Sequence, residues 1–383
     1  MPLSDLTNLR AQLLGWFHHR RRDLPWRRRR TLYGTWIAEI MLQQTTVATV
    51  IPYYQKFLRE FPDVHALAAA PEEKVLALWT GLGYYRRARH LHAAARHIVT
   101  RLGGELPDNA ASWRLLPGIG EYAAGAIASQ ALDEAVPAVD ANARRVLLRW
   151  TCADPAIARQ RKPADIGRLA TELVLREDPG TWNEALMELG AVICRARRPR
   201  CGDCPVLDHC AAGLAGRAEE IPPPVRRAAV EPVLLATLVL RQGGRVLLTG
   251  ADHPLVLRWP GDPPRARQET GSLHQGLRGL PMTPWYADRP DTARRLAEAG
   301  PVRAWVAQLL GRPRSDTLGD VAAAGTFTHA ITRYRLRVRV WAVDLPADAA
   351  VPTPAGAVWT ATPRDHPLSH LVTKSLSLKI LKN

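Results

Sequence analysis

Four of the five cysteines of this chain lie within the seventeen residues CRARRPRCGDCPVLDHC (194–210). The spacing C-x6-C-x2-C-x5-C is improbable by chance, so it predicts a metal site rather than free thiols, with the ligands Cys194, Cys201, Cys204 and Cys210. Zinc commonly uses two separated C-x2-C knuckles. One compact run with a single C-x2-C suits an iron–sulfur cubane, whose four thiolates converge from one loop. The spacing favours iron–sulfur and leaves zinc open.

The chain is strongly basic, with 52 Lys and Arg against 36 Asp and Glu and a net charge of +16. A basic surface attracts polyanions, so nucleic acid is the first candidate partner. A loop held by metal would direct Arg195 and Arg197 outward as phosphate contacts, although a solubilising charged loop is the alternative. Neither a cleavable signal nor a bilayer-spanning stretch is visible, which predicts no membrane association and a cytoplasmic protein, nucleoid-associated if bacterial.

The period of the apolar residues changes along the chain. Residues 1–218 show three- and four-residue steps, as in 35–58 and 71–84, which predict helices. The proline-rich stretch EEIPPPVRRAAVEP (219–232) predicts a linker. Beyond it, 233–240 and 245–250 predict two strands joined by a glycine turn, and 332–343 alternates arginine with apolar residues. We therefore expect a helical domain over 1–218 and a β-rich domain over 233–383, with a helix near 291–300.

The segment LPGIGEYAAGAIAS (116–129) places two glycines around one apolar residue, before a helix of small residues. Gly118 and Gly120 permit backbone conformations closed to other residues, which would let the first amides of the helix bind a DNA phosphate. Any turn between helices can use such a sequence. Asp140 follows in AVDANARRVLLR (138–149), where a helix N-cap is the simplest interpretation.

These features together resemble the endonuclease III superfamily of DNA glycosylases, and within it the adenine DNA glycosylases of the MutY type. Besides the hairpin and the cysteine loop, the resemblance rests on RDLPWR (22–27), EIMLQQTTVATVIPYY (39–54), WTGLGYYRRARHLHAAA (79–95) and VDANARRVL (139–147). It implies an α-helical helix–hairpin–helix glycosylase domain with a structural [4Fe–4S] cluster, followed by an α+β MutT-like domain of Nudix fold. It also implies a monomer that acts on double-stranded DNA in base excision repair, removing adenine mispaired with 8-oxoguanine or guanine.

Cleaving an N-glycosidic bond leaves a cationic sugar and expels a poor leaving group, so it requires an acid and an anion. The resemblance assigns the acid that protonates adenine at N7 to Glu39, which needs a raised pKa among apolar neighbours. A buried, salt-bridged glutamate is the alternative. The resemblance assigns the carboxylate that stabilises or briefly bonds the sugar to Asp140, and its orientation to Asn142. Members that nick the strand carry lysine where this chain has Tyr122, so we expect a monofunctional enzyme.

The resemblance also assigns residues that handle the extruded base. Residues lining the adenine pocket are Arg22, Trp26, Arg27 and Glu184, with the Glu184 carboxylate accepting from the exocyclic amine. Gln44 and Tyr84 fill or wedge the stack that the base leaves. Without the family, both would be ordinary surface residues.

In the second domain, the Phe–Ser–His loop with which the family recognises 8-oxoguanine matches Phe327, Thr328 and His329. Threonine keeps the hydroxyl and adds a methyl group, so altered lesion discrimination is expected. The acidic helix with which Nudix hydrolases hold magnesium is missing after Arg295, which predicts no nucleotide hydrolysis. VLRWPG (256–261) matches the family's Leu-Trp-Glu-Phe-Pro stretch without its glutamate, and Ala141 replaces a glycine.

Two other functions fit parts of the pattern. An endonuclease III-like enzyme for oxidised pyrimidines shares the hairpin and the cysteine loop, but Tyr122 and the second domain argue against it. A catalytically silent iron–sulfur protein that binds DNA has no use for both Glu39 and Asp140.

Overall fold

The computed structural model describes residues 3–224, 229–250, 255–256, 277–309, 320–331, 334–347, 353–363 and 366–378. By its contacts the chain forms two compact units, one of residues 1–70 with 87–226 and one of 71–86 with 227–383. The stretch 71–86 thus makes its contacts as part of the second unit. The boundaries expected at 218 and 233 stay a prediction.

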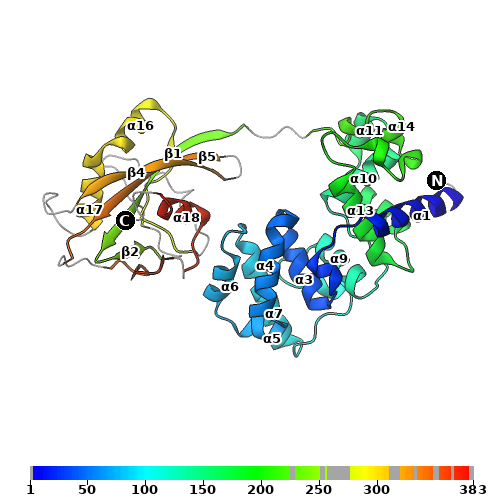
Figure 1. The fold of residues 1–383 in the computed structure, drawn as a ribbon, viewed down its shortest axis with the longest axis horizontal. Helices are drawn as coiled ribbons and strands as arrows, with labels where there is room; N and C mark the ends of the chain where they lie inside the picture. Colours follow the sequence, from blue (N-terminus) through cyan, green and yellow to red (C-terminus); the bar gives the residue numbers. More distant parts are fainter. Residues whose placement is uncertain are drawn as a thin grey trace. The chain divides into compact units, whose positions relative to one another are not determined.

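The first unit is helical, as the apolar periodicity predicts (Figure 1). The predicted helical segment 35–58 is broken into α3 and α4 by residues 43–46, where Gln44 has a φ of 57°. The helices are α1 (Leu3–Arg20), α2 (Pro25–Arg28), α3 (Leu32–Leu42), α4 (Val47–Glu60), α5 (Val64–Ala69), α7 (Arg86–Arg101), α8 (Ala110–Trp113), α9 (Glu121–Ala131), α10 (Ala141–Thr151), α11 (Pro155–Gln160), α12 (Pro163–Leu173), α13 (Pro179–Val192) and α14 (Ala211–Leu214), with 3-10 turns η1 (Cys201–Asp203), η2 (Leu207–His209) and η3 (Ala218–Glu220).

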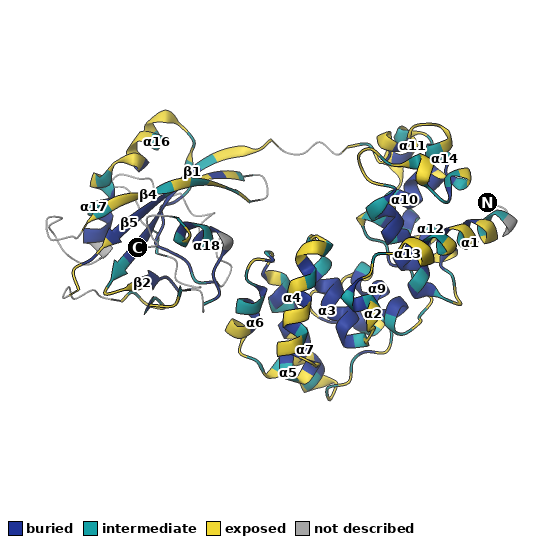
Figure 2. Ribbon diagram, in the orientation of Figure 1, coloured by how far each residue is buried: buried dark blue, intermediate teal, exposed yellow. Residues whose placement is uncertain are grey.

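Helix α3 lies in the interior of this unit, because residues 33–41 are all buried (Figure 2). It packs against α4 and α9, while α13 packs against α1, α9 and α10. One hydrophobic core joins α1, α10, α12 and α13 to the cysteine loop, which follows α13 directly. The fold therefore brings polar side chains of α3, α9, α10 and α13 toward one another.

The second unit is built on a mixed sheet with the order β4-β5-β1-β2-β6, in which β3 also pairs with β1. β1 runs parallel to β5, and the other pairs are antiparallel. The strands are β1 (Glu231–Gln242), β2 (Arg245–Leu248), β3 (Tyr286–Ala287), β4 (Val321–Ile331), β5 (Tyr334–Asp344) and β6 (Val358–Thr360), and the helices are α6 (Glu72–Trp79), α16 (Pro290–Ala297), α17 (Ala299–Leu309) and α18 (His370–Leu376).

Helices cover both faces of the sheet. Apolar residues of α16 and α17 share one core with alternate residues of β1, and residues of α18 share the other core with the intervening residues. The predicted alternation along β5 is confirmed, since Leu336, Val338 and Val340 are buried in the α18 core while Arg335 and Arg337 are exposed. Of the stretch VLRWPG, residues 257–261 lie outside the described residues.

Candidate active site

Glu39 is the buried carboxyl at the centre of the site. It lies in the second half of α3, whose first turn is capped by the Thr31 side chain, which accepts from the Gly34 amide. The Tyr122 hydroxyl donates to Oε2 of Glu39 across 2.7 Å. Burial raises the pKa of Glu39, and the donors on its two oxygens oppose that rise. Among the ion pairs that the structure describes, none involves Glu39, so the salt-bridged alternative is not what is found.

Asp140 lies at the N-terminus of α10 and caps it. Its Oδ1 accepts from the Ala143 amide at 2.6 Å, and its Oδ2 accepts from Nδ2 of Asn142 at 2.9 Å. Burial raises the pKa of Asp140, while these donors and the nearby cation of Arg145 oppose the rise. The N-cap interpretation is therefore right, and it leaves Oδ2 and its amide partner for a further role.

Glu39 and Asp140 belong to one constellation. The Asp140 charge contributes to the raised pKa of both Glu39 and Tyr122, so the three groups lie within electrostatic reach of one another. A cavity of about 520 Å³ opens beside Tyr122 and is also lined by Val139, next to Asp140, and by Arg144. Neither Glu39 nor Asp140 lines this cavity. Tyr122, which donates to Glu39, and Val139, the neighbour of Asp140, connect the two carboxyl groups to it.

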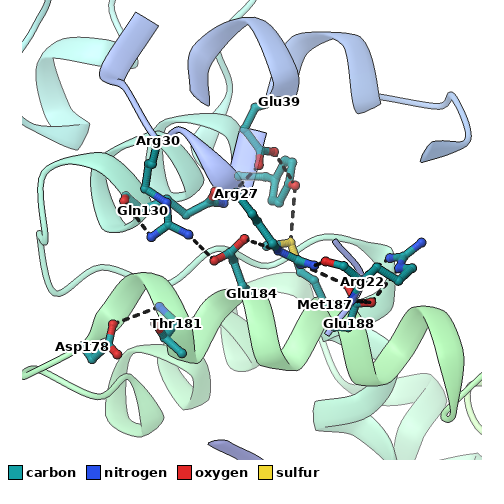
Figure 3. Close-up of polar contacts among 11 residues, drawn as sticks. Arg22, Arg27, Arg30, Glu39, Gln130, Asp178, Thr181, Glu184, Met187 and Glu188 are labelled. Atoms are coloured by element: carbon teal, nitrogen blue, oxygen red, sulfur yellow. Dashed lines mark hydrogen bonds and ion pairs between the residues drawn. The ribbon is translucent and has the colours of Figure 1, made fainter. Parts of the chain in front are cut away.

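Three of the four predicted adenine-pocket residues, Arg22, Arg27 and Glu184, lie in a network of ion pairs around buried carboxylates of α13 (Figure 3). Arg27 donates to Glu184 at 2.7 Å and to Glu188 at 3.0 Å, and Arg22 donates to Glu188 at 2.5 and 3.0 Å. Arg30 pairs with the second oxygen of Glu184. The carboxylate expected to read adenine is therefore already bound by two guanidinium groups, although each oxygen keeps a further lone pair.

Sequence reasoning missed Glu188 and Arg30. Glu188 follows Glu184 by four residues on α13, so both carboxylates face the same side of the helix. Arg30 ends the run of arginines 27–30. Trp26 is buried as well, and its ring lies edge-on to the Tyr54 ring with the two centroids 5.4 Å apart.

The glycine hairpin leads into α9. Gly118 has a φ of +78°, and a Cβ there would meet the Cβ of His90 at 2.5 Å. Gly120 has a φ of −92° and open space around it, so the expected special conformation applies to Gly118 alone. No side chain caps α9 after Gly120, which leaves its first amides for an anion.

Gln44 and Tyr84 share a left-handed backbone conformation that is rare outside glycine, with φ of 57° and 50°. Gln44 is exposed between α3 and α4, and the Tyr84 side chain is 58% exposed. Both residues are therefore exposed at turns with strained backbone conformations, Gln44 in the first unit and Tyr84 in the second. Strain of this kind clusters at functional sites.

The four clustered cysteines line a single cavity together with Arg149. Burial, and after it the charges of the three neighbouring cysteines, raise the pKa of Cys204 to about 12. No group of three His, Cys, Asp or Glu within the described ranges is placed to hold a single metal ion. Four cysteines that line one cavity fit an iron–sulfur cluster, which several thiolates hold together. Arg195 and Arg197 are exposed on this loop, as predicted.

Phe327, Thr328 and His329 lie within β4, at the edge of the sheet, rather than in a loop. Thr328 is exposed and pairs with Arg337, whereas Phe327 and His329 point to the opposite face. Lys374 of α18 lies over the Phe327 ring at 5.8 Å and donates to the Thr328 backbone oxygen. The three residues are thus presented on alternate sides of one strand.

Comparison with known proteins agrees with this geometry. Residues 37–170 match the family model of the HhH-GPD superfamily base excision DNA repair protein. Residues 194–210 match the iron–sulfur binding domain of endonuclease III, which decides between the two metal groups that the spacing left open. The cofactor is the [4Fe–4S] cluster, and the matched residues contain Cys194, Cys201, Cys204 and Cys210, the ligands that the sequence predicts.

Solved and curated relatives extend the match. A thermostable thymine-DNA glycosylase of known structure aligns with a TM-score of 0.51 and 28% identity, over 55% of this chain and 97% of that one. The adenine DNA glycosylase of Rattus norvegicus is 45% identical over 55% of this chain, which spans only 42% of that relative's length. The adenine DNA glycosylase of Mycolicibacterium smegmatis is 43% identical over 54% of this chain and 70% of the relative. With most of that relative covered at this identity, the chain belongs to the adenine DNA glycosylase family of the HhH-GPD superfamily.

Proposed function

We propose that this protein is a monofunctional DNA glycosylase that removes adenine mispaired with 8-oxoguanine or guanine in double-stranded DNA. The observation that carries the proposal is that Tyr122 of α9 donates to Glu39 and lines a cavity whose wall also includes Val139, next to Asp140. One carboxyl group is buried without an ion-pair partner, and the other is capped by amide donors. Such unequal environments are what glycosidic bond cleavage requires.

The reaction hydrolyses the bond between N9 of adenine and C1′ of the sugar. The extruded adenine receives the proton of Glu39 at N7, and the C1′–N9 bond breaks with its electron pair leaving on adenine. Asp140 stabilises the cationic sugar, and water then adds to C1′ and gives a proton to the Glu39 carboxylate, which restores the acid. The products are free adenine and an abasic site. Raised by burial, the pKa of Glu39 favours the protonated form that donates.

The side chains described in hydrogen-bond contact with Glu39 are those of Tyr122 and Gln130, and neither carries a nucleophilic amine. Tyr122 takes the hairpin position, and its hydroxyl is bound to Glu39. A phenol forms no Schiff base, so the abasic strand is expected to stay intact. The cluster, when bound, cross-links the loop 194–210 and thereby presents Arg195 and Arg197 to the DNA backbone.

The second unit is proposed to recognise 8-oxoguanine through Thr328. The supporting observation is that its hydroxyl is exposed on an edge strand, beside the basic side chains of β5. This part of the proposal is independent of the chemistry at Glu39.

The test uses iron-loaded protein and duplexes with A opposite 8-oxoguanine, A opposite G, T opposite G, thymine glycol opposite A, or no lesion. We expect adenine release from the first two, and strand cleavage only after alkali. Release of thymine glycol instead would support the endonuclease III-like alternative. Release of thymine opposite G would show that this chain acts as a thymine-DNA glycosylase. Binding without any base release would support the silent protein.

Two variants assign the chemistry. Glu39→Gln and Asp140→Asn keep the shape of each side chain, so binding to the A opposite 8-oxoguanine duplex should be retained. Base release should fall by roughly 10²- to 10⁴-fold in Glu39→Gln, the usual contribution of a general acid. Full activity in either variant would remove that residue from the mechanism. Borohydride trapping of a covalent protein–DNA adduct would contradict the assignment of Tyr122.

A further inference from the structure

Gln130 is a buried residue near the end of α9 that forms hydrogen bonds through both its side chain and its backbone. Its side-chain Nε2 donates to Oε1 of Glu39 across 3.0 Å. Its backbone oxygen accepts from Nη1 of Arg30 at 3.2 Å. Arg30 in turn pairs with Glu184, so one residue connects the central carboxyl group to the ion-pair network (Figure 3).

We propose that Gln130 is the positioning residue of the acid: it confines the transferable proton of Glu39 to Oε2 and ties that carboxyl group to the Arg30–Glu184 pair. The inference rests on the proposed role of Glu39 as proton donor. It adds a residue to which neither the motifs nor the family resemblance assigned a role.

The argument follows from donors and acceptors. A side-chain NH₂ group only donates, so the oxygen that faces it must accept and cannot point a proton toward it. Oε1 of Glu39 is therefore the carbonyl-like oxygen when the group is protonated. Oε2 faces the Tyr122 hydroxyl, which can donate or accept.

Met187 allows Tyr122 to change roles. Its sulfur lies 3.4 Å from the Tyr122 hydroxyl, which thus has a second acceptor besides Glu39. When Oε2 carries the proton, the Tyr122 proton turns to Met187, and its oxygen can accept from Oε2. Both protonation states of Glu39 are then hydrogen-bonded without moving a side chain, while Gln130 donates in both.

The ionised form of Glu39 gains most from the Gln130 donor, because a charged acceptor makes the stronger hydrogen bond. The groups acting on Glu39 from the packed elements are Tyr122 and Gln130 of α9, Glu184 of α13 and Asp140 of α10. The amide lowers the pKa of Glu39, whereas burial and the two carboxylates raise it. Removing the amide alone must therefore raise the pKa of Glu39.

The experiment measures this titration directly, without DNA. Protein labelled with ¹³C at glutamate carboxyl groups is titrated by NMR, and Glu39→Gln identifies the Glu39 resonance. In Gln130→Leu and in the less disruptive Gln130→Met, we expect the Glu39 midpoint to move to higher pH. Gln160→Met, which removes an exposed amide at the end of α11, is the matched control and should leave the midpoint unchanged.

Activity supplies a second readout. On the duplex with A opposite 8-oxoguanine, the alkaline limb of the profile of kcat against pH should shift to higher pH in the same variants. At the optimum, kcat should fall about tenfold with KM unchanged, because a misdirected proton weakens the chemical step and not binding. A folded Gln130→Met protein whose Glu39 midpoint does not move would overturn the inference, even if its kcat falls.

One further measurement needs no change at Gln130. In the wild-type protein, the side-chain amide resonances of Gln130 should follow the Glu39 titration, and in Glu39→Gln this pH dependence should vanish. Amide resonances that ignore the titration would overturn the inference. If the wild-type protein releases no adenine although both titrations behave as expected, the proposed function fails and the hydrogen-bond assignment stands.

Discussion

The guanidinium group of Arg149 donates to the sulfur of Cys194 across 3.2 Å and to the backbone oxygen of the same residue. It also donates to the backbone oxygens of residues 195, 196 and 221, and it is 1% exposed. One buried cation on α10 therefore holds both the start of the cysteine loop and the chain that follows it. Its positive charge also partly neutralises the negative charge that four cysteine thiolates would carry.

Replacing this cation should loosen the cluster loop. Arg149→Met leaves buried carbonyl oxygens without donors, which costs on the order of 3 kcal/mol of unfolding free energy. We expect faster loss of the cluster's visible absorption in air, measured against Arg144→Met. Arg144 is an exposed arginine on the same helix, and its removal should leave the absorption decay unchanged. Equal decay in the two variants would contradict the role of Arg149.

The raised pKa of Glu39 sets two pH dependences. Adenine release should decline as pH rises through that pKa, because the donating form is lost. The free energy of unfolding should also decline as pH rises, because the folded state binds the Glu39 proton more tightly than the unfolded state. The stability that this tighter binding gives is fully present below the unfolded pKa and is lost as pH rises through the folded pKa. Glu39→Gln should therefore be more stable than wild type at pH 8 and equal at acid pH, as urea unfolding can measure.

The two hairpin glycines should respond differently to alanine. At Gly118 the positive φ and the contact with His90 both oppose a Cβ, so Gly118→Ala should lose about 1 to 3 kcal/mol of stability. Gly120→Ala meets open space at an ordinary φ and should fold like wild type. Thermal unfolding compares them. If Gly120→Ala folds but loses DNA affinity, its Cβ obstructs the phosphate, which supports the hairpin as a DNA contact.

Glu188 should matter for stability far more than a surface acid. It is almost fully buried and pairs with Arg22 and Arg27, so Glu188→Gln removes the ion-pair partner of Arg22 and leaves Arg27 with Glu184 alone. We expect a loss of about 3 kcal/mol of stability, the low end for a broken buried pair because Arg22 is partly exposed. These partners lower the pKa of Glu188, so its contribution is present above the unfolded pKa and is lost as pH falls through the folded value. Asp23→Asn, which removes an exposed pair with Arg28, should have no measurable effect on urea unfolding.

Thr328 and Thr326 offer a matched pair for lesion recognition. Both are exposed on the same face of β4, two residues apart. Thr328→Ser removes only the methyl group. It should change the ratio of affinities for 8-oxoguanine and guanine opposite an uncleavable adenine analogue by up to about tenfold, the low end for one methyl contact because Thr328 is exposed. Thr326→Ser should leave this ratio unchanged. Identical ratios in both variants and wild type would place lesion recognition elsewhere.

Most of the architecture was readable from the order of residues. Four cysteines within one short loop can all reach one cluster, so their spacing alone predicts the cofactor site. Apolar residues at steps of three or four predict helices and at steps of two predict strands, because each period places them on one face. The same logic located β1, β2 and β5 and the helical first unit. It merged α3 with α4, since a left-handed residue such as Gln44 leaves no mark on the pattern.

Contacts between distant elements were beyond such reasoning. Gln130 meets Glu39 across 91 positions, and Glu188 meets Arg22 across 166. Neither pair has a local signature, because hydrogen bonds and ion pairs depend on which helix faces are packed together. The two carboxyl groups of the site were named from motifs, but their protonation depends on burial and on partners that only packing supplies. Residue order specified which groups were available, and the packing of α3, α9, α10 and α13 set their charge and their neighbours.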